Sequence, residues 1–190
     1  MSPDNLDRIF EVFARYGDRC YGERVSQVEH AIQCAVIAEE DGACDNLVAA
    51  SLLHDYGHLV ELQDLEDTDA TATDDNHELI AADVLASVFG AAVVQPIALH
   101  VAAKRYLCRV EPGYLDGLSA ASAHSLVLQG GVFTQAQADL FMQQPFAEDA
   151  VRLRRYDDLG KREGWDVGAF ERFRPLLERM RLRAPDLTNR

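Results

Sequence analysis

The chain has 190 residues, of which 48% are hydrophobic and 26% are charged, a balance that is typical of one globular domain with a sizeable core. Its formal net charge of -14 repels phosphate backbones and anionic membranes. The composition therefore disfavours nucleic acids and membranes as partners, and any anionic substrate has to be bound by local Arg or Lys side chains.

The N-terminal third of the chain predicts three helices. In the first, apolar residues recur at i, i+3, i+4 and i+7 from Leu6 onward. The second begins with the capping-box pattern Ser26-x-x-Glu29, and the third carries an apolar run into the pair His54-Asp55. The expected ranges are 4–16, from 27 to near Gly42, and from Asp45 to Gly57.

Residues 61–75 differ from their surroundings because acidic residues crowd a stretch that is rich in Thr and Ala. This composition predicts a solvated loop, and a lid over a site is the alternative interpretation. Further helices are expected over 77–89, 94–106 (with Pro96 near its first turn), 119–129, 134–143, 147–163 and 167–181. Alternating strand patterns are essentially missing, so we expect an all-α fold with a single domain over 1–190.

The four cysteines form no CxxC pair, and no signal peptide is recognised at the start of the chain. These features predict free thiols in a reducing compartment and a cytoplasmic protein. No apolar run approaches the roughly 18 residues that a membrane-spanning helix needs.

The adjacent residues His54 and Asp55, at the end of an apolar helix, are the main chemical signal. Together they can share a divalent cation, and the carboxylate can bridge two, whereas a hydrogen-bonded core pair is the alternative interpretation. His30, His77 and His100 fall on three other predicted helices and favour the metal, because bundles build metal sites from facing helices. Imidazoles with carboxylates suit Fe, Zn, Mn or Ni rather than Mg or Ca. A further carboxylate from Asp157 or Asp158 would complete the site.

The pattern His30…His54-Asp55…Asp157 resembles the HD superfamily of metal-dependent phosphohydrolases, and His77 and His100 resemble the additional ligands of its two-metal members. Several segments are similar to a narrower family, the HD-domain mixed-valent diiron oxygenases that cleave organophosphonates. These segments are Gln27–Cys34, Leu52–His58, Leu118–Gly131 and Arg154–Asp158, and the resemblance covers about residues 20–162. Myo-inositol oxygenase is a more distant relative, and its similar ending favours Asp157 over Asp158 because Lys161 then follows by four residues.

The resemblance implies an HD-domain helical bundle with a central dinuclear site of two iron ions, Fe(II)/Fe(III), and O2 as co-substrate. One iron would be held by His30, His54, Asp55 and Asp157, and the other by His77, His100 and the bridging Asp55. His58, Lys104, Ser122 and Arg154 would hold the phosphonate. Tyr21 and Glu23 would lie at the mouth, near the substrate nitrogen and the open iron, so the implied catalytic residues are His58, Tyr21 and Glu23.

The spacing of two cations is consistent with these roles. Lys104 follows His100 by four residues and Arg154 precedes Asp157 by three, so each cation shares a helix face with an implied ligand. A dianionic phosphonate bound to iron requires such cations. Plain surface solubility is the alternative interpretation of both side chains.

The family implies a diiron oxygenase of organophosphonate catabolism that acts on a small-molecule phosphonate. Its substrate would be a 1-hydroxy-2-(amino or trimethylammonio)ethylphosphonate, cleaved at the C–P bond to phosphate plus glycine or glycine betaine. The same ligands would serve an HD-type phosphohydrolase acting on a nucleotide or small phosphate ester, which is the alternative enzyme. A metal-dependent sensor or scaffold is a third interpretation, with little support from charge or domain count. The sequence leaves open the methylation of the amine and the oligomeric state.

Overall fold

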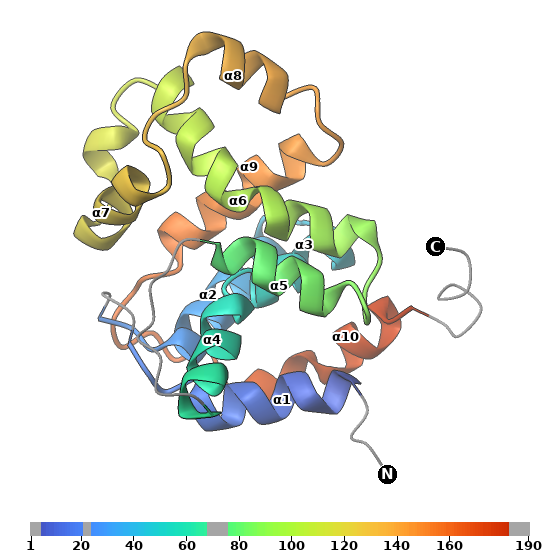
Figure 1. Ribbon diagram of the computed structural model, residues 1–190. Coiled ribbons are helices and arrows are strands. Elements are labelled where there is room, and N and C mark those ends of the chain that lie inside the picture. The colour runs from blue at the N-terminus through green and yellow to red at the C-terminus, as the bar shows by residue number, and fades with distance from the viewer. Residues whose placement is uncertain (1–4, 21–23, 68–75, 183–190) are drawn as a thin grey trace.

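The computed structural model describes residues 5–20, 24–67 and 76–182, in which helices are joined by loops and no strand occurs (Figure 1). The α-helices are α1 (Asn5–Tyr16), α2 (Gln27–Glu40), α3 (Asp45–Leu53), α4 (Tyr56–Asp67), α5 (His77–Leu85), α6 (Ala91–Val110), α7 (Ala120–Leu128), α8 (Gln135–Phe141), α9 (Ala147–Leu159) and α10 (Arg174–Met180). Two short 3-10 helices, η1 (Leu115–Gly117) and η2 (Phe170–Phe173), precede α7 and α10. The predicted all-α class and HD-type helical bundle are confirmed.

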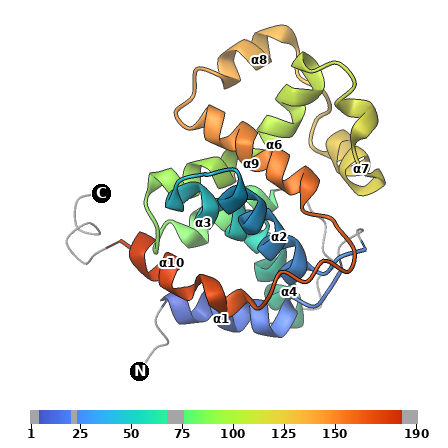
Figure 2. The ribbon, with the colours of Figure 1, turned by 180° about the vertical axis from the view of Figure 1, so that it is seen from behind.

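Helices α2, α3, α5, α6 and α9 form the centre of the bundle. The long helix α6 packs against α9, α3 and α5, while α2 packs against α3 and α9. Helices α1 and α10 cover one end of this group, and α7 and α8 lie at the other end, as the views from both sides show (Figures 1 and 2). The described helices include none that is both long and apolar enough to span a membrane.

Apolar faces at the predicted spacing bury the main core. In α1, the residues Leu6, Ile9, Phe10 and Phe13 are each buried in this core, which extends through α2 and α3 to α10. A small second cluster of Ala103, Phe141, Ala147 and Ala150 joins α6, α8 and α9. Three of its four members are alanines, so the helices approach closely there, and α8 is anchored beside α6.

The predicted capping box at Ser26 is confirmed. The Ser26 side chain accepts a hydrogen bond from the Glu29 N–H, and the Glu29 carboxylate accepts one from the Ser26 N–H at 2.8 Å. Because this cap fixes the first turn of α2, it also fixes the direction in which His30 points.

The third helix ends earlier than expected. It stops at Leu53 instead of continuing to Gly57, and α4 begins at Tyr56. The His54 ring Nδ1 lies 2.9 Å from the Ser51 carbonyl oxygen and competes with the backbone for this acceptor. The break leaves His54 and Asp55 at a helix junction, where both side chains face the same side.

The predicted solvated loop over 61–75 is wrong in its first part, because α4 continues to Asp67. Leu59 is buried, and Val60 and Leu62 pack against the main core, so the acidic residues occupy a helix with an apolar side. Residues 68–75, and with them the lid interpretation, lie outside the described residues.

The ends of other expected helices shift as well. Helices α5 and α9 stop at Leu85 and Leu159, and α6 begins three residues early, so that Pro96 lies inside it.

Candidate metal centre and substrate pocket

Six side chains that the sequence singled out converge in the centre of the bundle. They are His30 from α2, His54 and Asp55 from the α3–α4 junction, His77 from the start of α5, His100 from α6 and Asp157 from α9. The four histidines and Asp157 are each at most 5% exposed, and 19% of the Asp55 side chain is exposed. Five separate elements therefore supply a buried cluster of imidazoles and carboxylates.

The two carboxylate oxygens of Asp55 face different pairs of imidazoles. Oδ2 lies 3.5 Å from His30 Nε2 and 3.4 Å from His54 Nε2. Oδ1 lies 3.5 Å from His77 Nε2 and 3.7 Å from His100 Nε2. A carboxylate with two histidine pairs on its two oxygens has the arrangement of a bridging ligand between two cations.

Asp157 completes only one of the two groups. Its Oδ1 lies 3.4 Å from His30 Nε2, and its Oδ2 lies 4.0 Å from His54 Nε2. Among the described residues, the group around His30 and His54 therefore contains two imidazoles and two carboxylates. The group around His77 and His100 contains two imidazoles and only the shared carboxylate. The second group has fewer protein donors and so leaves more room for ligands from solution.

Hydrogen bonds behind three of the rings direct their Nε2 atoms into the centre. His30 Nδ1 lies 2.8 Å from the Gly160 carbonyl oxygen and His100 Nδ1 lies 2.8 Å from that of Ile97, as His54 Nδ1 does at Ser51. A carbonyl oxygen only accepts hydrogen bonds, so Nδ1 carries the hydrogen and each neutral ring presents a lone pair at Nε2. This is the tautomer that binds a metal through Nε2.

The charges of the two carboxylates suit a cation site. Burial raises the pKa of Asp55, but the neighbouring His54 and His77 outweigh it and hold that pKa well below its usual value. Burial likewise raises the pKa of Asp157, and Arg154 and Lys161 lower it well below its usual value. Burial lowers the pKa of His100, so this ring is neutral. Burial also lowers the pKa of His30 and His54, but Cys34 and Asp157 at His30, and Asp55 at His54, outweigh it and raise both values, so these two rings hold protons that a bound metal would replace. Anionic carboxylates and neutral imidazoles are the donors that first-row transition metals prefer.

Two glycines allow the cluster to form. A Cβ on Gly57 would lie 1.9 Å from the His77 carbonyl oxygen, so only glycine lets α4 approach the start of α5 this closely. A Cβ on Gly160 would lie 2.5 Å from Cys34 Sγ, at the residue whose carbonyl orients His30. Both glycines flank predicted ligands in the sequence, but their role becomes visible only in the packed structure.

Cys34 also lies within ligand distance of His30 and His54, but its geometry differs from that of Asp157. Its sulfur is 3.7 Å from Nδ1 and 3.8 Å from Nε2 of His30, so it lies beside the ring rather than in front of either lone pair. The thiol instead donates to the Tyr156 carbonyl oxygen at 3.5 Å, and burial raises its pKa. We therefore assign Asp157, and not Cys34, to the cluster.

A cavity of about 480 Å3 opens beside the cluster, lined by residues of α2, α4–α7 and α9 and by Lys161. The four residues that were implied to hold the phosphonate all line it: His58, Lys104, Ser122 and Arg154. The His58 ring stacks on His77 with centroids 3.9 Å apart, and its Nδ1 lies 3.7 Å from Glu61 Oε2. Tyr21 and Glu23 lie outside the described residues.

Arg154 is buried and already engaged by protein groups. It donates to Asp157 Oδ2 at 2.6 Å, to Ser122 Oγ at 3.3 Å and to the Tyr114 hydroxyl at 3.1 Å, and it pairs with Asp158. Tyr114 also donates to Asp158. Arg154 therefore contacts both candidate ligands, but only Asp157 also lies beside the imidazoles, with Oδ1 3.4 Å from His30 Nε2.

Lys161 is a cation of the cavity that was not among the predicted site residues. Its Nζ donates to Ser122 Oγ at 3.1 Å and lies 3.5 Å from Asp157 Oδ1. Lys104 Nζ donates to Ser125 Oγ at 2.8 Å, and burial and the nearby Arg154 lower its pKa to about 8. The spacing of Lys161, four residues after Asp157, is the same signal that pointed to Lys104 after His100. Three buried or half-buried cations beside a metal-capable cluster suit a small anion.

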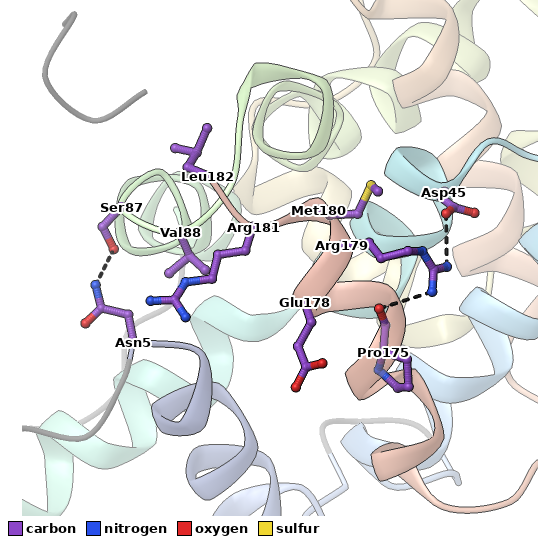
Figure 3. Close-up of a pocket in the computed structure, with 10 residues that line it drawn as sticks. All are labelled: Asn5, Asp45, Ser87, Val88, Pro175, Glu178, Arg179, Met180, Arg181 and Leu182. Atoms are coloured by element: carbon purple, nitrogen blue, oxygen red, sulfur yellow. Dashed lines mark hydrogen bonds and ion pairs between the residues drawn. The ribbon is translucent and has the colours of Figure 1, made fainter. Parts of the chain in front are cut away.

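A wider groove of about 1140 Å3 lies elsewhere, between α1, the α5–α6 turn and α10 (Figure 3). It contains no histidine, and Arg179 is used to bind Asp45 at 3.0 Å and the Pro175 carbonyl at 3.1 Å. Its size exceeds that of the central cavity, but its side chains offer no comparable cluster of ligand atoms.

Three curated proteins are similar to this chain over most of its length, whereas no family model matches it. The hydroxymethylphosphonate dioxygenase of Gimesia maris is 42% identical over 175 residues, 92% of this chain and 87% of that protein. The glycine-betaine-forming [1-hydroxy-2-(trimethylamino)ethyl]phosphonate dioxygenase of Leisingera caerulea is 38% identical over 176 residues, 92% of this chain and 89% of that protein. An uncharacterized protein of Acanthamoeba polyphaga mimivirus is 33% identical over 175 residues, 91% and 80% of the two chains.

The two named relatives are both phosphonate dioxygenases, and a dioxygenase implies O2 and a metal cofactor. The buried histidines and carboxylates provide a group that can hold metal. Sequence identities of 42% and 38% over 92% of the chain, together with this centre, show that the protein is an oxygenase enzyme that belongs to the family of phosphonate-cleaving dioxygenases.

Proposed function

We propose that the protein binds two iron ions, in the mixed-valent Fe(II)/Fe(III) state, and oxidatively cleaves the C–P bond of a small 1-hydroxyalkylphosphonate. The observation that carries this proposal is the Asp55 carboxylate, whose two oxygens each face a separate pair of imidazoles. One iron would be held by His30, His54, Asp55 and Asp157, and the other by Asp55, His77 and His100. When bound, this pair supplies O2 activation and a Lewis acid for the substrate oxygens.

The residues of the cavity would bind and orient the phosphonate. Lys104, Arg154 and Lys161 compensate its charge, and Ser122 fixes its position, because the Ser122 hydroxyl is already in contact with both Arg154 and Lys161. His58, stacked on His77, would border the phosphonate on the side of the second iron. Because Lys104 and Arg154 are buried, these charge interactions are strengthened, so the C1–H bond is held in one orientation.

The organic part of the substrate is expected to carry an amine or a trimethylammonium group. We expect a 1-hydroxy-2-(amino or trimethylammonio)ethylphosphonate, which would give phosphate plus glycine or glycine betaine, with Tyr21 and Glu23 near the nitrogen. The Leisingera caerulea relative is named for the trimethylamino substrate, and the Gimesia maris relative for hydroxymethylphosphonate, which has no amine. Hydroxymethylphosphonate is therefore a further candidate.

The test is anaerobic reconstitution with iron and ascorbate, followed by O2 and measurement of phosphate release from these three hydroxyphosphonates. We expect iron to bind at two ions per chain, and phosphate release to require O2. If none of the three compounds releases phosphate, the proposed function is wrong. Nucleotides and small phosphate esters, assayed without O2, test the phosphohydrolase alternative, and we expect no hydrolysis of them.

A further inference from the structure

One side of α7 faces the central cavity along its whole length. Ser122, Ser125 and Gln129 recur at i, i+3 and i+7, and all three line the cavity. The first two contact the cations, since Ser122 accepts from Arg154 and Lys161, and Ser125 accepts from Lys104. Gln129 is the remaining polar member of this row.

The backbone after Gln129 is held rigidly. The Gly131 N–H donates to the Leu126 carbonyl at 2.8 Å and the Gly130 N–H to that of Val127 at 3.3 Å, which is a Schellman cap with Gly130 at φ +90°. Arg105 on α6 then donates to the carbonyl oxygens of Gly130 at 2.9 Å and Gly131 at 2.8 Å. A Cβ on Gly130 would lie 3.0 Å from the Arg105 guanidinium, so glycine at this position allows Arg105 of α6 to approach the end of α7.

This anchored position leaves one polar atom of Gln129 unsatisfied. Its side-chain oxygen is buried, and within residues 5–20, 24–67 and 76–182 it has no hydrogen-bond partner. A buried carbonyl oxygen without a donor costs about 1–3 kcal/mol. In a cavity wall, such an atom is open to a donor from a water or from a bound molecule.

The position of Gln129 suits the organic end of the substrate rather than the phosphonate. It lies seven residues after Ser122, about 10 Å along the helix axis from the place where Arg154 and Lys161 meet, and four residues after Ser125, which accepts from Lys104. A dianionic phosphonate offers only acceptors and would be repelled by a carboxamide oxygen. A terminal ammonium or hydroxyl group offers N–H or O–H donors.

We propose that Gln129 is a specificity-determining residue whose side-chain oxygen accepts a hydrogen bond from a donor at the far end of the hydroxyphosphonate, a primary ammonium or a terminal hydroxyl. This inference rests on the proposed function and adds a substrate class to it. Compounds that carry such a donor are preferred over the trimethylammonium analogue, whose nitrogen has no hydrogen.

The experiment compares Gln129→Leu, which removes the acceptor, with Gln129→Glu, which keeps an acceptor oxygen and removes the amide donors. Four compounds are used: 1-hydroxy-2-aminoethylphosphonate, 1,2-dihydroxyethylphosphonate, the trimethylammonium analogue and hydroxymethylphosphonate. Gln129→Leu lowers kcat/KM about 10-fold or more for the first two, as expected for the loss of one hydrogen bond to a charged or buried polar group, and leaves the last two within about 2-fold. Gln129→Glu retains the preference for the donor-bearing compounds.

Two results would overturn the inference. An equal loss on all four compounds in Gln129→Leu would mean a contact with the phosphonate or a purely structural role. Equal damage by Gln129→Glu and Gln129→Leu would mean that the amide donates instead of accepting. Gln143→Leu on the exposed surface is the matched control, and thermal melting and iron content confirm that each variant is folded and loaded.

A binding readout separates this inference from the proposed function. Anaerobic calorimetry of the iron-loaded protein measures Kd for the same four compounds without turnover. If the wild-type protein released no phosphate at all, the proposed function would fail, and the Kd differences between wild type and Gln129→Leu would still decide the contact. If the wild-type protein bound the trimethylammonium analogue as tightly as the amino compound, the inference would fail alone.

Discussion

His30 and His54 bring their Nε2 atoms to 3.2 Å from each other, although each ring already directs its Nδ1 at a backbone carbonyl. Two neutral rings in this state would point lone pairs at one another, which is repulsive, and His77 and His100 show the same 3.2 Å approach of their Nε2 atoms. A cation bound by both rings of a pair removes the repulsion. At the first pair a proton does the same, because Cys34 and Asp157 outweigh burial and raise the pKa of His30 to about 10. Each pair is therefore a place where a bound cation would stabilise the fold.

Removal of metal should destabilise the protein. A chelator is expected to lower Tm, and added Fe(II) to restore it; at a free metal concentration 100-fold above Kd the stabilisation is about 2.7 kcal/mol. Asp55→Asn should lose both ions, because Asp55 contacts both histidine pairs, whereas Asp83→Asn on the exposed face of α5 should retain them. Metal analysis and thermal denaturation measure both effects. Retention of one full equivalent by Asp55→Asn would contradict a bridging role.

The sequence predicted which side chains converge in the centre of the bundle better than it predicted their surroundings. The His54-Asp55 pair is adjacent in the chain, and the capping box at Ser26 fixes the helix that carries His30, so local patterns carried this information. Asp158 is bound by Tyr114, a residue more than forty positions away in the chain, whereas Asp157 faces the imidazoles. Such a contact is created by tertiary packing and leaves no periodic signal.

The break at Leu53 and the helix over 61–67 were missed for related reasons. A ring nitrogen of His54 takes the Ser51 carbonyl, which no propensity scale describes. The many acidic residues from Glu61 onward predicted a loop. The helix forms nevertheless, because Leu59 and Leu62 stabilise it by packing on the main core. Tertiary contacts override composition at both places.

The affinity for phosphonate should fall at alkaline pH. Burial and Arg154 lower the pKa of Lys104 to about 8, so this side chain is charged below that pH and neutral above it. We expect kcat/KM of the wild-type enzyme to decrease as the pH rises through about 8, because the charged form binds the dianion. In Lys104→Arg the guanidinium stays protonated, and the decrease should disappear. A wild-type profile that is flat across this range, or unchanged by Lys104→Arg, would exclude this role.

Tyr114 should act on the substrate through Arg154. Its hydroxyl accepts from Arg154 Nε at 3.1 Å and donates to Asp158, so it fixes the plane of the guanidinium. Tyr114→Phe is expected to raise KM for the phosphonate several-fold with little change in iron content, since the loss of one such hydrogen bond costs about 1 kcal/mol. Tyr106→Phe is the control, because Tyr106 packs on Phe141 and is not among the residues that line the central cavity. A fall in kcat at constant KM would argue against a positioning role.

Gly160 couples the end of α9 to the metal centre, and a methyl group there should disturb both. In Gly160→Ala the new Cβ would lie 2.5 Å from Cys34 Sγ, so the carbonyl that accepts from His30 has to move. We expect a destabilisation of about 1–3 kcal/mol, as for overpacking in a core, together with weaker iron binding. The double variant Cys34→Ala/Gly160→Ala removes the clashing sulfur and should recover part of both losses, measured by thermal denaturation and metal titration. Cys34→Ala alone should keep its iron, because Cys34 lies beside the His30 ring and the proposed ligand is Asp157, whose Oδ1 faces His30 Nε2. Loss of iron from that single variant would instead make Cys34 a ligand.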